Sequence, residues 1–394
     1  MSTPAPGKSV KLWTPAYTML LLVNLFSGMA GQMVVPIVAK YALHLGATLS
    51  VASTIASLMS LMGLFCCPFA GLVSDRVNRK WLMVISAGIN GLSVLSHAFI
   101  SSVPALVVIR LLTGVSFSFM SVATVAYTTA YIPRERLGEG MGYIALATIV
   151  AQAFGPGVGL DLLERFGYPI TFVVAGIFAL AGVLVVLIIP YHAEQQARPA
   201  GRRGIHLEDL FAPQLLLFTL LVMLLSAANG LASTFLTLIA DERHIENIAV
   251  FFTAYAACMV FIRPFAGKLL DRKGIYIILL PSFLISAAGL VLVGVASTLW
   301  LIVLAGVLKA FGQGAGIPSI QAHCVKVLSR ERAGVATSTC QIGQHVGNAL
   351  APILGSYVVT AFSYRTLFCG YAVLMLALGW LLLFVQYRRD KRAA

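Results

Sequence analysis

The chain has 394 residues, of which 59% are hydrophobic and only 10% are charged, and its formal net charge at pH 7 is +13. Soluble domains carry about 25% charged residues, so a chain this apolar cannot cover itself with a polar surface in water. The composition excludes a soluble globular protein and predicts a chain whose main solvent is lipid.

Apolar runs long enough to cross a bilayer fill almost the whole chain. A spanning helix needs about 20 apolar residues, and only helices or closed barrels satisfy their backbone in hydrocarbon. Runs of this length without strict alternation predict helices. We count twelve, at residues 12–38, 48–70, 81–100, 104–130, 138–162, 168–190, 213–239, 248–266, 275–297, 300–325, 333–359 and 363–387.

These spans predict an all-α polytopic membrane protein with five segments. A polar, cytoplasmic N-terminal tail covers residues 1–11, and the N-terminal six-helix half covers 12–190. A cytoplasmic linker at 191–212 precedes the C-terminal six-helix half at 213–387, and a basic cytoplasmic tail covers 388–394. No segment is long enough for a soluble catalytic or nucleotide-binding domain.

The two halves repeat each other at an offset of 196 residues. This offset relates the following residues: Gly71 to Gly267, Asp75 to Asp271, Arg76 to Arg272, Pro156 to Pro352 and Gly159 to Gly355. A register kept without a gap over so many special residues predicts two copies of one unit in the same orientation. Transporters built in this way hold their substrate near the midplane, between the halves.

The basic residues gather on one side of the predicted membrane. The side with both termini holds 20 of the 27 Lys and Arg residues and the other side holds 4, while Arg110, Arg263 and Lys309 lie within spans. The positive-inside rule places the basic side in the cytoplasm. The net charge is therefore a topology signal rather than a sign of nucleic-acid binding, and the short loops fit a bacterial inner (plasma) membrane.

Cofactor and metal chemistry have little support in the sequence. The six cysteines all lie in apolar runs without a C-x-x-C spacing, which favours small core residues. No paired His or Cys spacing predicts a metal site. The glycine-rich stretches near 155 and 312 lie within spans and lack the context of a phosphate loop. We expect no metal and no cofactor.

Three motifs resemble those of one transporter family. The loop between spans 2 and 3 reads Gly71-x-x-x-Asp75-Arg76-x-x-Arg79-Lys80. It is similar to the cytoplasmic loop 2–3 signature of the major facilitator superfamily, and residues 267–274 form a weaker copy. Asn78 stands where the family has Gly, and Asn also tolerates the left-handed backbone of a tight turn.

Two further motifs lie within spans 4 and 5. Span 4 contains Arg110-Leu-Leu-Thr-Gly114, which resembles a second family motif with Thr113 in place of the usual Gln. Span 5 contains Gly155-Pro156-Gly157-Val-Gly159, which resembles the motif of the drug:proton antiporter branch. Gly155, Pro156 and Gly159 would allow a bend and close helix approach, and ordinary helix packing is the alternative.

The resemblance implies a cytoplasmic gate in the loop 2–3 motif. The carboxylate of Asp75 would face the positive N-terminus of span 11 and pair with nearby arginines. The alternative is a charged loop that only sets topology. The gating residues under this hypothesis are Gly71, Asp75, Arg76, Arg79 and Lys80, with Asp271 and Arg272 in the second copy.

Span 11 carries the clearest polar pattern within the membrane. Gln341, Gln344, His345 and Asn348 lie at i, i+3, i+4 and i+7, which places them on one helix face. A polar face is costly in lipid, so we expect it to line a water-filled cavity. We expect the same cavity to receive Asn24, Gln32, Arg110, Asn229, Lys309 and Gln313. Helix–helix hydrogen bonding is the alternative, and it applies best to Asn24 and Gln152.

All 14 Asp and Glu residues lie in loops or at span ends. The titratable groups within the cavity would be Arg110, Lys309 and His345, and a cationic lining favours an anionic or zwitterionic substrate. Lys309 and His345 can titrate when buried and are candidate proton carriers. Arg110 stays charged, so it would bind substrate or tune its neighbours. Alternatively, Arg110 and Lys309 snorkel or bond carbonyl oxygens.

The sequence therefore predicts a secondary active transporter that works by alternating access and is not an enzyme. The family resemblance favours proton-coupled efflux of a small organic molecule, either drug-like or an anionic or zwitterionic metabolite. An uptake carrier or facilitator for an organic anion is the alternative, and a lipid flippase or a receptor on a transporter scaffold is more distant. The expected partners are a small-molecule substrate, protons and the lipid bilayer, and we expect a monomer.

Overall fold

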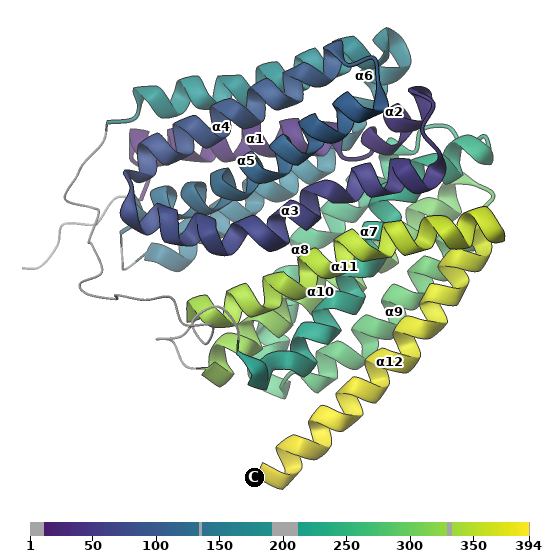
Figure 1. The fold of residues 1–394 in the computed structure, drawn as a ribbon. Coiled ribbons are helices and arrows are strands. Elements are labelled where there is room, and N and C mark those ends of the chain that lie inside the picture. Colours follow the sequence, from purple (N-terminus) through teal and green to yellow (C-terminus); the bar gives the residue numbers. More distant parts are fainter. Residues whose placement is uncertain (1–11, 134–135, 191–211, 329–332, 394) are drawn as a thin grey trace, which may run out of the picture.

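The chain folds into a bundle of long helices (Figure 1). The structure, a computed structural model, describes residues 12–133, 136–190, 212–328 and 333–393, and these ranges contain no strand. The linker and the N-terminal tail predicted above lie almost entirely outside the described residues.

The described residues of the first half form six helices and a short 3₁₀ turn at His97–Phe99. The longest helix turns at Gly167, whose φ of 78° and ψ of 179° suit a residue without Cβ. The helices are α1 (Pro15–Val34), α2 (Val38–His44), α3 (Leu49–Arg76), α4 (Arg79–Ser96), α5 (Val103–Ala130) and α6 (Leu137–Ile188).

The second half begins with a 3₁₀ turn at Pro213–Leu215. Six helices follow: α7 (Leu216–Glu242), α8 (Ala249–Lys273), α9 (Tyr276–Val295), α10 (Leu299–Leu328), α11 (Ala333–Ala361) and α12 (Tyr364–Ala393). The last helix runs through Arg388–Arg392, so the predicted basic tail continues the helix of span 12 instead of leaving it.

Ten helices of the described residues are long and apolar enough to cross a membrane. One of them, the 50-residue stretch Glu139–Ile188, turns at Gly167 and so provides two passes. Helix α11 is not among the ten because its polar side chains lower its hydropathy, but its 29 residues are long enough to span. Together these account for the twelve predicted spans, and the predicted all-helical fold class is confirmed.

The loop predicted between spans 2 and 3 is shorter than expected. Helix α3 continues to Arg76 and α4 begins at Arg79, so most of the motif is helical. Asn78 has a φ of −61° and a ψ of 114°, so the expectation of a left-handed turn was wrong. Its side chain instead accepts a hydrogen bond from the backbone nitrogen of Trp81 at 3.3 Å. Asn is suited to this position because it caps the N-terminus of a helix.

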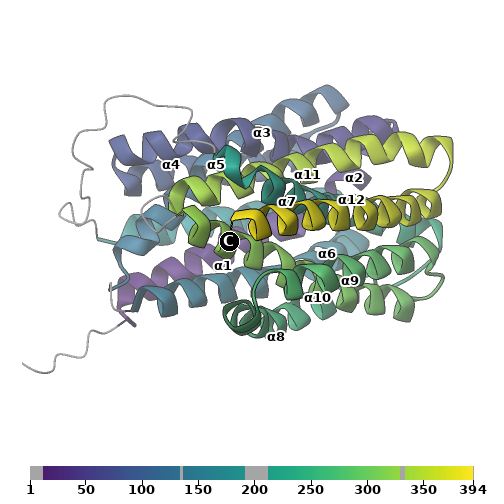
Figure 2. The same ribbon diagram turned by 90° about the horizontal axis from the view of Figure 1, so that it is seen from below.

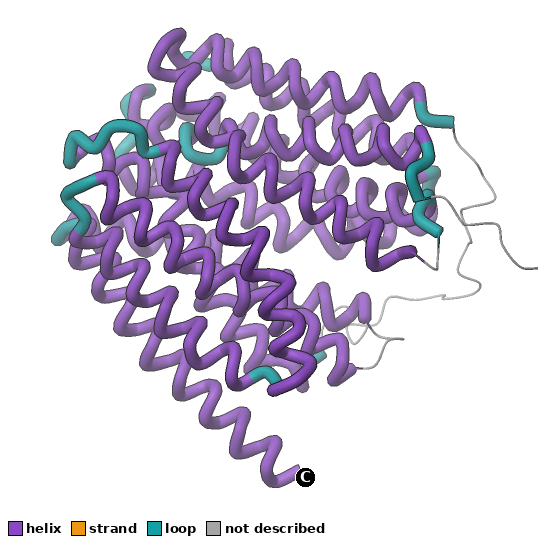
Figure 3. The backbone as a smooth tube through the Cα atoms, turned by 180° about the vertical axis from the view of Figure 1, so that it is seen from behind, coloured by secondary structure: helices purple, strands orange, loops and turns teal. Residues whose placement is uncertain are grey.

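The two sets of helices form a V (Figures 1 and 3). We call the end that holds Arg76, Lys80 and Lys273 the basic end, and the end that holds Lys40 and Asp241 the closed end. The halves approach each other at the closed end and diverge toward the basic end. Two seams join them, one between α3 and α11 and one between α6 and α8, and Figure 2 shows the first seam from another side.

Candidate functional site

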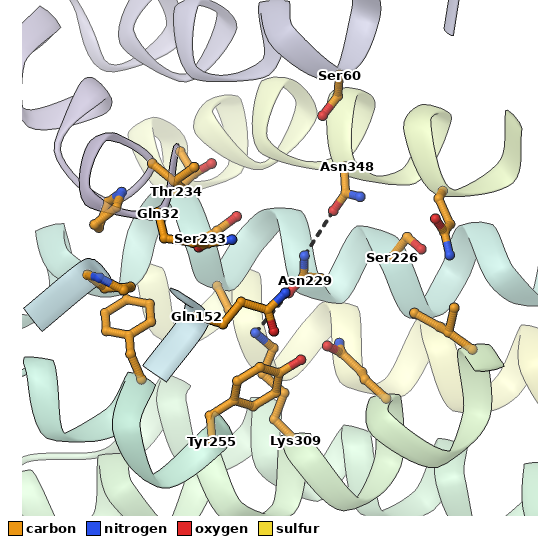
Figure 4. Close-up of a pocket in the computed structure, with 18 of the residues that line it drawn as sticks. Gln32, Ser60, Gln152, Ser226, Asn229, Ser233, Thr234, Tyr255, Lys309 and Asn348 are labelled. Carbon is orange, nitrogen blue, oxygen red and sulfur yellow. Dashed lines mark hydrogen bonds between the residues drawn. The ribbon is translucent and has the colours of Figure 1, made fainter. Parts of the chain in front are cut away.

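A cavity of about 440 Å³ lies between the two halves. Helices α1, α3, α5 and α6 line it from one half, and α7, α8, α10 and α11 line it from the other (Figure 4). Three cations and no Asp or Glu occur among its described lining residues. Its polar and charged lining residues are Gln32, Ser60, Arg110, Gln152, Ser226, Asn229, Ser233, Thr234, Tyr255, Arg263, Lys309, Gln313, Gln321, Gln344 and Asn348.

Lys309 anchors a chain of hydrogen bonds across the C-terminal half. Its Nζ donates to Oδ1 of Asn229 at 3.0 Å, and Nδ2 of Asn229 donates to Oδ1 of Asn348 at 3.3 Å (Figure 4). Because an ammonium only donates, Lys309 sets the orientation of the Asn229 amide. The chain links α10, α7 and α11, three helices that the sequence predicts to meet at the cavity.

Arg110 lines the cavity but is also bound to its own half. Its side chain is only 3% exposed. Its Nε and Nη2 donate to the carbonyl oxygens of Ile55 and Ala56 on α3, at 3.4 and 3.3 Å. These bonds use two of the five N–H groups of the guanidinium. The expected cavity position and the alternative of carbonyl binding therefore both hold for this residue.

Within the part of the chain that the structure describes, three buried polar atoms of the cavity lining have no hydrogen-bond partner: Nε of Arg263, Oε1 of Gln152 and Oγ of Ser226. A buried polar group left unpaired costs about 1–3 kcal/mol. The sequence favoured helix–helix hydrogen bonding for Gln152, whereas the structure places its side chain in the cavity lining with Oε1 unpaired.

The predicted polar face of α11 is divided between two surroundings. Gln344 and Asn348 line the cavity, whereas Gln341 is exposed and His345 packs against α3. Successive helical residues differ by about 100° in direction, so Gln344 and His345 fall on opposite flanks of the face. The expectation that Gln341 and His345 line the cavity was wrong.

His345 sits on a glycine in the seam between α3 and α11. A Cβ added at Gly63 would lie 2.4 Å from Cε1 of the imidazole. Nε2 of His345 also lies 3.8 Å from Sγ of Cys67. The 196-residue offset relates this pair to Met259 and Ile149, which pack together in the other seam. One seam is therefore apolar at this level and the other contains an imidazole.

Of the remaining predicted cavity residues, Gln32 and Gln313 lie in the cavity lining and Asn24 does not. Nε2 of Gln313 donates to the carbonyl oxygen of Leu225 at 3.0 Å. Nδ2 of Asn24 donates to the carbonyl oxygen of Leu20 at 2.8 Å, within its own helix. Asn24 therefore shows neither the expected cavity position nor a hydrogen bond between helices.

The glycines of the span 5 motif allow α6 to approach α1 closely. A Cβ at Gly155 would lie 2.5 Å from Cβ of Gln32, and one at Gly159 would lie 2.5 Å from the carbonyl oxygen of Met33. Pro156, between them, lines the cavity. These glycines thus hold one wall of the cavity against the helix that carries Gln32.

The predicted cytoplasmic gate is only partly described. Nothing is described of the surroundings of Gly71 or of the side chains of Asp75, Arg76 and Asp271. Arg79 begins α4, and Arg272 is exposed. Nζ of Lys80 donates to the carbonyl oxygens of Leu187 and Ile189, at 2.9 and 2.6 Å. These are the last carbonyls of α6, so this contact of Lys80 caps a helix of its own half. Gating by the other residues stays a prediction.

The closed end is joined by contacts that the sequence did not predict. Nζ of Lys40 lies 2.7 Å from Oδ2 of Asp241, and Oγ1 of Thr237 donates to the carbonyl oxygen of Pro36 at 3.1 Å. Both contacts connect the first transmembrane segment to α7 across the halves. The only available signal was that Lys40 is one of four basic residues on its side of the membrane.

A model of the Major Facilitator Superfamily matches residues 20–277 and 220–394 of this chain. Two curated relatives are named multidrug resistance protein MdtG. The one from Salmonella arizonae is 25% identical over 375 residues, covering 91% of this chain and 92% of the relative. The one from Serratia proteamaculans is 24% identical over 392 residues and covers 94% of both chains.

Solved transporter structures share the fold. The nucleoside transporter NupG superposes with a TM-score of 0.78 at 14% identity, covering 94% of this chain and 98% of that chain. The human organic anion transporter MFSD10 superposes with a TM-score of 0.68 at 19% identity, covering 94% of this chain and 100% of that chain. The similarity covers most of the chain.

Proposed function

The chain belongs to the Major Facilitator Superfamily and is therefore a multi-pass membrane transporter, and we propose that it exports a small organic anion through the cavity between its halves. The proposed mechanism is alternating access with exchange for protons. The proposed location is a bacterial inner membrane, with both termini in the cytoplasm, as the positive-inside rule indicates.

One observation supports the anionic substrate above the others: the cavity is lined by Arg110, Arg263 and Lys309 and by no acid among the described residues. A unit charge about 6 Å from one of these cations interacts with it by about 3 kcal/mol at an effective dielectric constant of about 20. That energy favours an anion and disfavours a cation. The guanidinium of Arg263 also lines the cavity and carries N–H donors of the kind that a carboxylate, sulfonate or phosphonate accepts from.

The arrangement of the halves supports alternating access. The closed end is joined by Lys40 and Asp241, while the halves diverge toward the basic end (Figure 1). With the basic end in the cytoplasm, this is the state in which the cavity receives substrate from inside the cell. Export then requires the halves to separate at the closed end and to meet at the basic end, where Asp75 is the predicted gating residue.

Two further considerations support export coupled to protons. Curated relatives that align along most of the chain are named multidrug resistance proteins, and the span 5 motif resembles that of drug:proton antiporters. No Asp or Glu lies mid-span in the sequence. The candidate proton carriers are therefore Lys309 in the cavity and His345 in the α3–α11 seam. Protonation of His345 would place a positive charge between these two packed helices.

The test is substrate flux in proteoliposomes under an imposed pH gradient. A panel of organic anions and organic cations would be offered to the wild type and to the variants Lys309→Ala and His345→Ala. We expect anions to move in response to the gradient, and we expect the variants to lose that coupling. Movement of cations alone, with both variants unchanged, would refute the proposal. Anion flux that ignores the pH gradient would instead indicate a facilitator.

A further inference from the structure

The ammonium of Lys309 lies against two aromatic rings of α8. Nζ is 4.6 Å from the centroid of the Tyr255 ring and 5.7 Å from that of Phe251. The two rings are parallel within 4°, with centroids 6.4 Å apart, because the residues are one helical turn apart. They form one aromatic wall, and Lys309, which is only 8% exposed, lies beside it.

Proteins bind organic cations with aromatic groups in this way. A cation within about 6 Å of a ring centroid is attracted by the ring's electron-rich face. Here the cation belongs to the chain itself, and Oδ1 of Asn229 accepts a hydrogen bond from it. A cationic ligand would have to displace this ammonium or remain beside it. No acid of the described lining compensates the positive charge.

We infer that Lys309 determines the sign of the substrate's charge. Its ammonium occupies the aromatic wall of Tyr255 and Phe251, which would otherwise hold an organic cation. This inference rests on the proposed function, in which the substrate binds in this cavity. With Lys309 in place, the aromatic wall is occupied and the neighbouring space favours an anion. Without the lysine charge, Phe251, Tyr255 and Asn229 remain as a site for a cation.

The magnitude follows from the charges. Two like unit charges about 6 Å apart repel, at an effective dielectric constant of about 20, by an energy that corresponds to about a 100-fold loss of affinity. Removal of the lysine charge relieves this repulsion and also frees the ring faces. We therefore expect Lys309→Gln to bind a cation at least 10-fold more tightly than the wild type does, and an anion at least 10-fold more weakly.

The test uses two probes that share a phenyl ring and differ in charge, benzenesulfonate and phenyltrimethylammonium. Their binding to the purified full-length protein in detergent is measured by calorimetry. The wild type should bind benzenesulfonate more tightly, and Lys309→Gln should bind phenyltrimethylammonium more tightly. The double variant Lys309→Gln with Tyr255→Leu should lose the gained cation affinity, because a leucine offers no ring face.

Arg263→Gln is the matched control, because it removes one positive charge from the same cavity and leaves the aromatic wall intact. It should weaken benzenesulfonate binding without creating a phenyltrimethylammonium site. Equal gains of cation binding in Arg263→Gln and Lys309→Gln would overturn the inference, as would no gain in Lys309→Gln or a gain that survives Tyr255→Leu. Thermal unfolding of each variant verifies that it is folded.

The two proposals fail in different ways. A wild type that binds and transports no anion contradicts the proposed function. The cation affinity of Lys309→Gln, and its dependence on Tyr255, then still decides whether the aromatic wall binds a cation when the lysine charge is absent.

Discussion

Gly63→Ala tests the seam between α3 and α11. The added methyl group would lie 2.4, 2.6 and 3.0 Å from Cε1, Nδ1 and Nε2 of His345. Either the two helices separate, or the imidazole rotates away from its position. Overpacking a close contact costs about 1–3 kcal/mol, and an off-rotamer side chain costs about 0.5–1.5 kcal/mol. The cheaper response is rotation of the imidazole, so the cost is about 0.5–1.5 kcal/mol.

This cost applies to the described arrangement, in which α3 and α11 meet at His345. If separating the closed end loosens this contact, the variant favours the opposite arrangement. A penalty of about 0.5–1.5 kcal/mol changes the ratio of the two arrangements by about 2- to 13-fold. Transport should slow, because the state that receives substrate from the basic end becomes less populated.

The assay is the distance between spin labels at positions 81 and 273, which lie at the basic end on opposite halves. The labels would be attached through a non-canonical amino acid, so that the native cysteines remain. Gly63→Ala should move the distribution toward short distances. Gly63→Ala with His345→Ala should restore it, because the ring that the methyl group meets is gone.

Gly88→Ala is the control, because a Cβ there would meet no described atom within 4 Å other than those of its chain neighbours and its own helix backbone. It should leave the distance distribution as in the wild type. The packing argument would be refuted if Gly63→Ala also left the distribution unchanged, or if removal of the imidazole failed to reverse its effect.

Three further predictions concern the rest of the bundle. Lys40→Gln should change the ratio of the two arrangements only about 1.4- to 5-fold in the same distance measurement, because exposed ion pairs are worth about 0.2–1 kcal/mol. The Asp241 side chain is 58% exposed. The charge exchange Lys40→Asp with Asp241→Lys should restore the wild-type ratio. Gly159→Ala should lower the melting temperature by several degrees or prevent folding, because its Cβ would lie 2.5 Å from the backbone of α1. Gly157→Ala is the control and should be tolerated, because the nearest contact of its Cβ is at 3.5 Å. Arg243→Gln should cost about 2–3 kcal/mol in thermal unfolding without changing which probes bind, because Arg243 donates to three carbonyl oxygens at the end of α9; an unchanged melting temperature would show that these bonds contribute little.

The sequence contains enough to place the helices and to identify the fold. Hydrocarbon permits few backbone structures, so apolar runs of sufficient length had to be helices. The 196-residue repeat then set the two halves and predicted a site between them. Residues near the middle of long spans, such as Lys309, Asn229 and Gln313, could be assigned to the cavity because polar groups there have few other places to go.

The sequence could not decide how each helix is rotated or which distant residues meet. Gln344 and His345 are neighbours in sequence, yet one lines the cavity and the other packs on Gly63. Tyr255 resembled an ordinary core aromatic residue, and its role depends on Lys309 arriving from another helix. These outcomes depend on packing between helices, to which local periodicity is insensitive.

The sequence by itself therefore determined the solvent, the helices, the repeat and the charge of the cavity, because these follow from composition and local spacing. The tertiary structure decided that Lys40 joins Asp241 across 201 residues, that Lys80 caps α6, and that the ammonium of Lys309 lies on an aromatic wall. Each of these is a contact between helices far apart in the chain. Close packing of side chains and the directionality of hydrogen bonds select such contacts, and both exist only once the halves are assembled.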